Sequence, residues 1–134
     1  MVRREFRASD DELANITAFV EEQLESLGAS MKVSMQIAVA LEEIFVNIAH
    51  YAYPDGDGMM SLTVDSEGDS VSLRFADAGI PFDPLAKSDP DVTLSAEERN
   101  IGGLGIYMVK KTMDDVRYLY ENGQNILIIV KKLR

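Results

Sequence analysis

Residues 40–47 read Ala-Leu-Glu-Glu-Ile-Phe-Val-Asn and lie in a helix that we expect from about residue 30 to residue 51. Apolar residues recur through this segment at helical spacing, which predicts that one face of the helix is buried. A helix this apolar needs a sheet or other helices to cover it, so the segment predicts a layered domain. The apolar stripe consists of Ile37, Leu41, Ile44 and Ile48.

Polar residues of the same helix fall together on the opposite face. Glu43 and Asn47 are four residues apart, and Gln36 and His50 extend their row. The row either faces solvent or forms the wall of a cleft, because a buried carboxylate or carboxamide is costly unless something satisfies it. In a cleft, Glu43 is suited to take a proton and Asn47 to offer its carbonyl oxygen to Mg²⁺. We expect His50, at the helix end, to be a structural or rim residue.

The whole chain predicts the element order β-α-α-β-β-loop-α-β-β. Hairpin turns are expected at Gly68-Asp69 and Asn122-Gly123, and a long loop at about residues 80–101 has the length of a lid. We expect a single domain over residues 1–134. Its predicted class is α+β: a two-layer sandwich whose mainly antiparallel, mixed sheet carries three helices on one face. The expected strands are 2–7, 60–64, 71–76, 116–121 and 124–132, and the expected helices are 13–27, 30–51 and 103–113.

The start of the first expected helix has the signature of a capping box. In Ser9-Asp10-Asp11-Glu12, the serine hydroxyl is placed to accept from the third helical N–H. The glutamate is placed to reach back to the serine backbone.

Composition excludes several classes of function. The 134 residues include 13 basic and 23 acidic ones, for a net charge of −10, which disfavours binding to nucleic acid or anionic membranes. The chain has no cysteine and one histidine, so disulfides and thiolate or multi-histidine metal sites are not expected. We see neither a signal peptide nor the roughly 20 apolar residues of a membrane span. We therefore expect a cytoplasmic protein.

A second candidate site follows the strand expected at 71–76. Asp77-Ala78-Gly79 is either an ordinary turn or a place where a carboxylate accepts a hydrogen bond from a ligand amine. In the second case, Gly79 leaves room for a flat ring beside the backbone.

A third candidate site is Gly102-Gly103-Leu104-Gly105, directly before the last expected helix. Glycines allow backbone N–H groups to point inward, and a helix N-terminus carries about half a positive charge. This suits a polyphosphate, whereas a flexible helix start is the plainer reading. The sequence matches neither the P-loop nor the dinucleotide fingerprint. Arg99, just upstream, and Lys87, from the loop, are either positioned to reach a phosphate or are surface charges without a role.

These three sites, in this order, resemble the N, G1 and G2 boxes of the GHKL (Bergerat) ATP-binding fold. Residues 40–47 together with Phe82-Asp83-Pro84 and Met113-Asp114-Asp115-Val116 resemble one branch, the bacterial anti-sigma factor serine/threonine kinases. The resemblance extends from about residue 6 to residue 133.

The resemblance implies a role for each motif. Glu43 matches the family's catalytic base, Asn47 its Mg²⁺ ligand, and Asp77 the carboxylate that recognises adenine. Gly79 matches the G1 glycine, and the G2 glycines wrap the phosphates. The residues expected to contact the nucleotide are Asn47, Asp77, Gly79, Arg99, Gly103, Leu104 and Gly105.

Three positions depart from the family pattern. Pro81 stands where a second G1 glycine is common, and Asn125 lies near the position of a Gly-Thr pair that helps to hold adenine. Arg99 is displaced from the position of the family's lid arginine.

The resemblance further implies ATP and Mg²⁺ as cofactors, a homodimer, a bound sigma factor, and phosphorylation of a STAS-domain anti-anti-sigma protein. Two alternatives stay open. One is a non-catalytic module that binds nucleotide or a partner, and the other is the catalytic domain of a histidine kinase. Because ATP would bring about four negative charges to a cleft with Glu43 and Asp77, the acidic chain predicts strict Mg²⁺ dependence.

Overall fold

The computed structural model describes residues 1–86 and 103–134. The described chain follows the predicted element order, with short helical turns added at three places. The strands are β1 (Val2–Arg7), β2 (Met59–Glu67), β3 (Ser70–Asp77), β4 (Asp115–Glu121) and β5 (Gln124–Lys132). The helices are α1 (Leu13–Ser26), α2 (Met31–Asn47) and α3 (Gly103–Thr112), with the turns η1 (Asp10–Glu12), η2 (Ile48–Ala52) and η3 (Pro84–Ala86).

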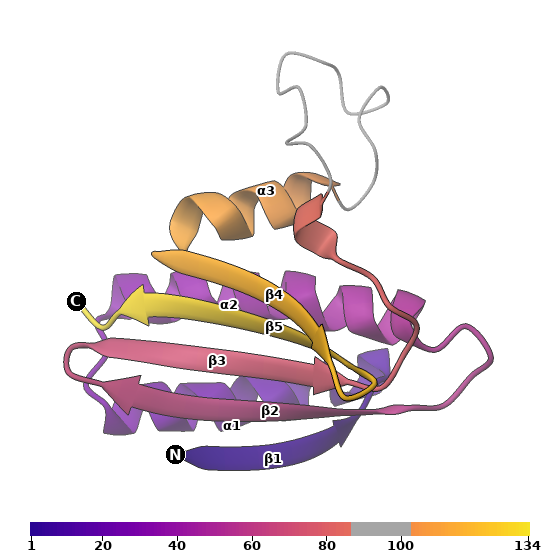
Figure 1. The fold of residues 1–134 in the computed structure, drawn as a ribbon. Helices are drawn as coiled ribbons and strands as arrows, with labels where there is room; N and C mark the ends of the chain where they lie inside the picture. The colour runs from indigo at the N-terminus through magenta and orange to yellow at the C-terminus, as the bar shows by residue number, and fades with distance from the viewer. Residues whose placement is uncertain (87–102) are drawn as a thin grey trace.

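The five strands form one sheet in the order β1-β2-β3-β5-β4 (Figure 1). Every pairing among the described strands is antiparallel, so the expectation of a mixed sheet was wrong. Two of the four pairings follow from tight hairpins, which join β2 to β3 and β4 to β5, while helices lie between the strands of the other two pairs. In the second hairpin, Asn122 and Gly123 both have positive φ (55° and 76°), as a type I′ turn requires.

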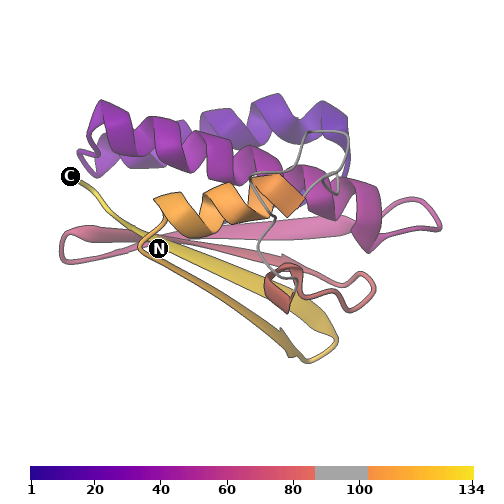
Figure 2. The same cartoon turned by 90° about the horizontal axis from the view of Figure 1, so that it is seen from above.

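The three helices cover one face of the sheet, which confirms the predicted α+β two-layer architecture (Figure 2). The core lies between the layers. Leu62, Leu73 and Phe75 from the sheet meet Leu41 and Phe45 from α2, and all five side chains are buried. Inward residues of the strands alternate with outward ones, as the sequence predicted.

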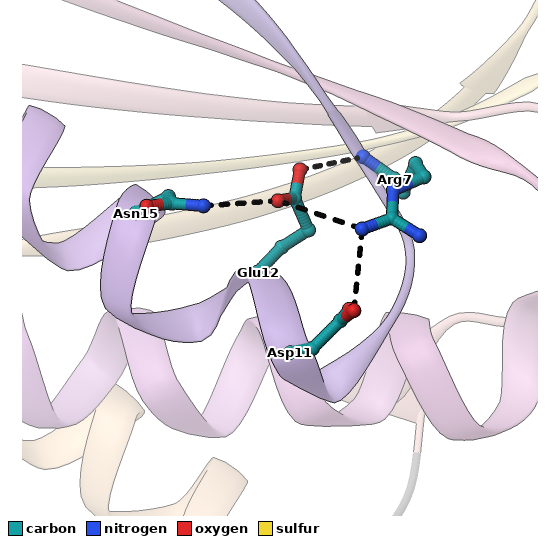
Figure 3. A network of polar contacts seen from close by, with 4 residues as sticks. All are labelled: Arg7, Asp11, Glu12 and Asn15. Carbon is teal, nitrogen blue, oxygen red and sulfur yellow. Dashed lines mark hydrogen bonds and ion pairs between the residues drawn. The ribbon is translucent and has the colours of Figure 1, made fainter.

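The first helix begins differently from the predicted capping box (Figure 3). Ser9 makes no side-chain cap; its hydroxyl bonds the Asp11 carboxylate instead and holds the pKa of Asp11 below its ordinary value. Glu12 does reach back, but its Oε2 accepts from the backbone N of Arg7 at 3.2 Å, and its Oε1 accepts from Asn15 at 3.0 Å. The 3₁₀ turn η1 lies between Ser9 and α1, so Glu12 and not Ser9 stands at the N-terminus of α1. The bond from the Arg7 backbone to Glu12 connects the helix to the end of β1.

The helix α2 continues into η2, a π-helical turn. Together they form a 22-residue helix, Met31–Ala52, with a mean hydropathy of 1.2 over its most apolar window. By length and composition this helix could cross a membrane, which the sequence-based expectation did not foresee. Its buried residues, among them Ile37, Leu41 and Phe45, pack into the core between the layers. The buried share of its most apolar window is 33%, so one face of the helix belongs to the core of the domain.

Candidate functional site

An open pocket lies where the C-terminal part of α2 meets the ends of β3 and β5. It encloses about 480 Å³ of empty space, part of it open to solvent. Most of the lining is apolar or aromatic, with three polar exceptions: Asn47, Asp77 and Asn125. The other lining residues are Ile44, Ile48, Tyr51, Ala52, Phe75, Ile80, Phe82, Pro84, Ile106, Tyr118 and Leu127.

The long helix gives the pocket one continuous wall. Ile44, Asn47, Ile48 and Tyr51 recur every three or four residues, so they point to the same side. Asn47 therefore lies beside the apolar residues of the wall, whereas the sequence analysis placed it on the opposite face. It sits at the boundary between the two faces. Its carboxamide makes no hydrogen bond within the described part of the chain, which leaves it available to a ligand.

The other polar residues of that helix lie outside the pocket. Glu43 is half-buried one turn before Asn47 and makes no hydrogen bond or ion pair to any described residue, but it does not line the pocket. His50 pairs with Asp10 of η1, with 2.8 Å between Nε2 and Oδ2. The π-helical turn has more residues per turn than an α-helix, so it rotates His50 out of the row. The expectation of a structural or rim role agrees with this position.

Asp77 is the most buried charged residue of the pocket, with only 5% of its surface exposed. Its Oδ1 accepts from the backbone N of Gly79 at 2.9 Å and from Nδ2 of Asn125 at 3.0 Å. Its Oδ2 has no partner among the described residues. No fully buried side-chain oxygen in that part of the chain lacks a hydrogen bond, so Oδ2 retains some exposed surface, and Asp77 lines the pocket. The site thus presents one open carboxylate oxygen among apolar walls.

Gly79 approaches the end of the long helix closely. A Cβ at this position would overlap the carbonyl oxygen and Cβ of Ala52, and the next residue, Ile80, donates its N–H to the same carbonyl at 2.9 Å. The side of Gly79 toward which a Cβ would project is therefore filled by Ala52. The expectation that this glycine leaves room for a ligand ring stays a prediction. The glycine lets residues 77–80 pack against the helix that carries Asn47.

Two tyrosines frame the base of this turn, and sequence reasoning missed both. The hydroxyl of Tyr53 donates to the Met59 carbonyl at 2.6 Å and accepts from the Ala78 N–H at 2.8 Å. Burial raises the pKa of Tyr53, and the negative charge of Asp77 raises it further. Tyr118, on β4, donates its hydroxyl to Oδ1 of Asn125. These bonds hold Ala78, directly after Asp77, and the side chain of Asn125, which lies opposite Asp77.

Asn125 is the third polar residue of the pocket and is only 7% exposed. It lies directly opposite Asp77 in the pairing of β3 with β5. The strand pattern carried a signal for it, since Asn125 precedes Leu127 and Ile129 at inward-facing positions. A polar residue at an inward position of a strand calls for a buried partner.

The glycine-rich segment meets the pocket at its edge. Gly103 is the first residue of α3, and Leu104 and Gly105 belong to its first turn. Ile106 lines the pocket, so the N-terminal part of this helix borders it. Arg99, Gly102 and most of the expected lid lie outside the described residues.

The donor set near Asn47 suits a metal that shares its ligands with a substrate. Within residues 1–86 and 103–134, no group of three or more histidine, aspartate or glutamate side chains is gathered for a metal. Mg²⁺ is commonly held by one or two protein oxygens together with water and substrate phosphates, so it needs no such cluster. The unpartnered Asn47 oxygen, facing the pocket near the start of α3, fits this arrangement.

The family model of the histidine kinase-like ATPase domain matches residues 6–131. The chain belongs to this family. Its five-stranded antiparallel sheet and three helices agree with the catalytic domain of the histidine kinase ThkA, with a TM-score of 0.57 at 13% identity over 99% of this chain and 98% of that one. The RsbU and RsbW domains of a Mycobacterium tuberculosis protein give a TM-score of 0.64 at 15% identity, over 99% of this chain and 33% of that one.

Curated relatives of this ATPase-family chain include serine-protein kinases named RsbW. The protein from Bacillus cereus (strain AH187) is 26% identical over 87% of this chain and 69% of its own length. The protein from Listeria monocytogenes is 27% identical over 75% of this chain and 68% of its own length. A further B. cereus relative (strain Q1) is matched over 59% of its length. The chain thus spans about two thirds of the length of these three relatives.

Proposed function

We propose that this chain is an ATP- and Mg²⁺-dependent protein serine/threonine kinase that acts as an anti-sigma factor. The observation that carries the proposal is the open Oδ2 of Asp77 at the base of an apolar pocket. An exocyclic amine of a purine would donate to this oxygen, while the apolar walls would hold the flat ring. The similarity to RsbW serine-protein kinases supports the choice of reaction.

The remaining polar groups suit the phosphate side of such a ligand. Asn47 would offer its oxygen to Mg²⁺, and the start of α3, at Gly103 to Gly105, would offer backbone N–H groups and a partial positive charge. Mg²⁺ and these N–H groups would neutralise the phosphates, which an acidic chain of net charge −10 needs. Arg99, from the segment before the helix, would add a positive charge.

Glu43 would serve as the catalytic base. It stands one helical turn from Asn47 and has no partner that would hold its carboxylate elsewhere among the described residues. From there it would accept the proton of a serine or threonine hydroxyl as that oxygen attacks the terminal phosphate. The substrate would be a STAS-domain anti-anti-sigma protein, and the sigma factor would be held by a homodimer of this chain in the cytoplasm.

The experiment that tests this proposal is phosphoryl transfer from γ-labelled ATP to a candidate STAS protein. The wild-type chain should label it on serine or threonine. Glu43→Gln should lower the rate by about 10²–10⁴-fold, the usual contribution of a positioned base. Glu42→Gln, at the neighbouring exposed glutamate, is the matched control and should label as wild type does. Equal labelling by wild type and Glu43→Gln would contradict the assignment of the base.

A second function is favoured by the position of Glu43 outside the pocket lining. In this alternative the chain binds nucleotide and regulates a partner by docking, without catalysis. Mg-ATP would then bind in a calorimetric titration, yet no STAS protein would be labelled.

A further inference from the structure

Every hydrogen-bonding group of the Asn125 side chain is paired with another residue of the protein. Its Nδ2 donates to Oδ1 of Asp77 at 3.0 Å and to the Ile80 carbonyl at 2.8 Å. Its Oδ1 accepts from the Phe82 N–H at 3.0 Å and from the hydroxyl of Tyr118. A carboxamide has two donor hydrogens and two acceptor lone pairs, so none remains for a ligand.

The identity of the partners fixes the orientation of this amide. The Ile80 carbonyl can only accept and the Phe82 N–H can only donate, so the nitrogen and oxygen of Asn125 cannot be exchanged. The two groups flank Pro81, which has no N–H of its own. One side chain therefore holds the backbone on both sides of the proline.

The same side chain also determines which oxygen of Asp77 is open. Asn125 and the Gly79 N–H occupy Oδ1 and leave Oδ2 toward the pocket. Ile80 and Phe82, whose backbones Asn125 holds, contribute side chains to the pocket wall. Asn125 thus holds both the Asp77 carboxylate and this part of the pocket wall.

We propose that Asn125 is a positioning residue that assembles the nucleotide pocket before the ligand arrives. It orients Asp77 toward the purine amine with its nitrogen and holds residues 80–82 against the sheet with both ends of its amide. A group held in place beforehand lowers the ordering cost of binding. This inference rests on the proposed nucleotide binding, and it names a residue that acts without touching the ligand.

Two substitutions separate the two ends of the amide. Asn125→Ala removes all four bonds. Asn125→Asp keeps an oxygen for Phe82 and Tyr118 but loses both donors and places a second carboxylate against Asp77. The control is Gln124→Ala, at the adjacent exposed residue of the same strand. Because Asn125→Asp preserves size, it also covers the case in which the alanine variant fails to fold.

The test combines Mg-ATP titration calorimetry with amide hydrogen exchange of the ligand-free protein. Both variants at position 125 should bind Mg-ATP at least about tenfold more weakly, since each leaves buried polar groups unpaired. Because the hydroxyl of Tyr118 also bonds the Phe82 backbone, exchange is compared in a Tyr118→Phe background. There the Phe82 amide should exchange faster with Asn125→Ala and remain slow with Asn125→Asp and Gln124→Ala.

Either of two results would overturn the inference: wild-type affinity in both position-125 variants, or unchanged exchange of the Phe82 amide when Asn125→Ala is added to Tyr118→Phe. If the wild-type chain itself binds no ATP, the proposed function fails. In that case, amide hydrogen exchange at Phe82 is the measurement that tests whether Asn125 holds residues 80–82.

Discussion

Nδ2 of Asn125 lies 3.0 Å from Oδ1 of Asp77, across a pair of directly opposed residues in β3 and β5. The contact joins the strand end that carries the candidate ligand-binding carboxylate to the last hairpin of the chain. Because it occupies one carboxylate oxygen, it leaves the other free of protein partners among the described residues, at the pocket that Asp77 lines.

Asp77→Asn should weaken ATP binding by about ten- to a hundredfold. The substitution keeps the shape of the side chain but removes the charged acceptor, and a hydrogen bond to a charged group is worth about 1.5–3 kcal/mol. Titration calorimetry with ATP and GTP measures the effect. Asp69→Asn, in the β2–β3 turn, is a control that should leave binding unchanged. An Asp77→Asn variant that binds ATP as tightly as wild type would show that this carboxylate does not accept a hydrogen bond from the purine amine.

Asn47→Ala should lower the affinity for ATP only when Mg²⁺ is present. If Asn47 acts through the metal, wild type and variant should bind equally weakly in EDTA and differ in Mg²⁺. Gln36→Ala, at a half-buried polar residue of the same helix, provides the comparison and should behave as wild type. A loss of affinity that is the same with and without Mg²⁺ would place Asn47 in direct contact with the nucleotide instead.

Gly79→Ala should destabilise the domain by about 1–3 kcal/mol, the usual cost of forcing an extra group into a packed site. The new methyl group would overlap the Ala52 carbonyl, and this backbone cannot move without breaking its bond to Ile80. Denaturant unfolding measures the change. Gly68→Ala is less suitable as a control because Gly68 has a positive φ of 59°. Ala78→Gly, at the exposed neighbour, is better matched and should cost less.

Stability should fall at alkaline pH in a way that depends on Tyr118. Burial raises its pKa above the ordinary value of 10.0, the bond to the Phe82 backbone acts against this, and the charges of Asp83 and Asp77 add to the rise. The folded state then holds the phenolic proton more tightly than the unfolded state. The resulting stability is fully present below the unfolded pKa and is lost as pH rises through the raised folded pKa. The free energy of unfolding of Tyr118→Phe, measured against pH, should decline less steeply than that of wild type.

The sequence predicted the elements well because their signals are local. Asn122-Gly123 and Gly68-Asp69 fix the hairpins, and the apolar stripe of α2 fixes the core helix. It also predicted that Asp77 and Asn47 belong to one site, through the resemblance between motifs. The structure places both in the same pocket, while their roles toward a ligand stay predictions.

What the sequence did not predict depends on contacts between distant segments. The bond between Asp77 and Asn125 requires the register of β3 against β5, which no local pattern specifies. The true face of Asn47 depends on where the neighbouring strands leave space, and the position of His50 depends on a π-helical turn. The close packing of Gly79 against Ala52 was not predicted for the same reason, because Ala52 comes from another element.

The most direct test of the central claim, that this pocket binds ATP through Mg²⁺, is a calorimetric titration of the wild-type chain with ATP. We predict saturable binding of one nucleotide per chain in Mg²⁺ and a large loss of affinity in EDTA. Absence of binding in Mg²⁺ would contradict the claim that the pocket is a nucleotide site. Binding that is unchanged by EDTA would contradict the claim that Mg²⁺ is needed to neutralise the phosphates.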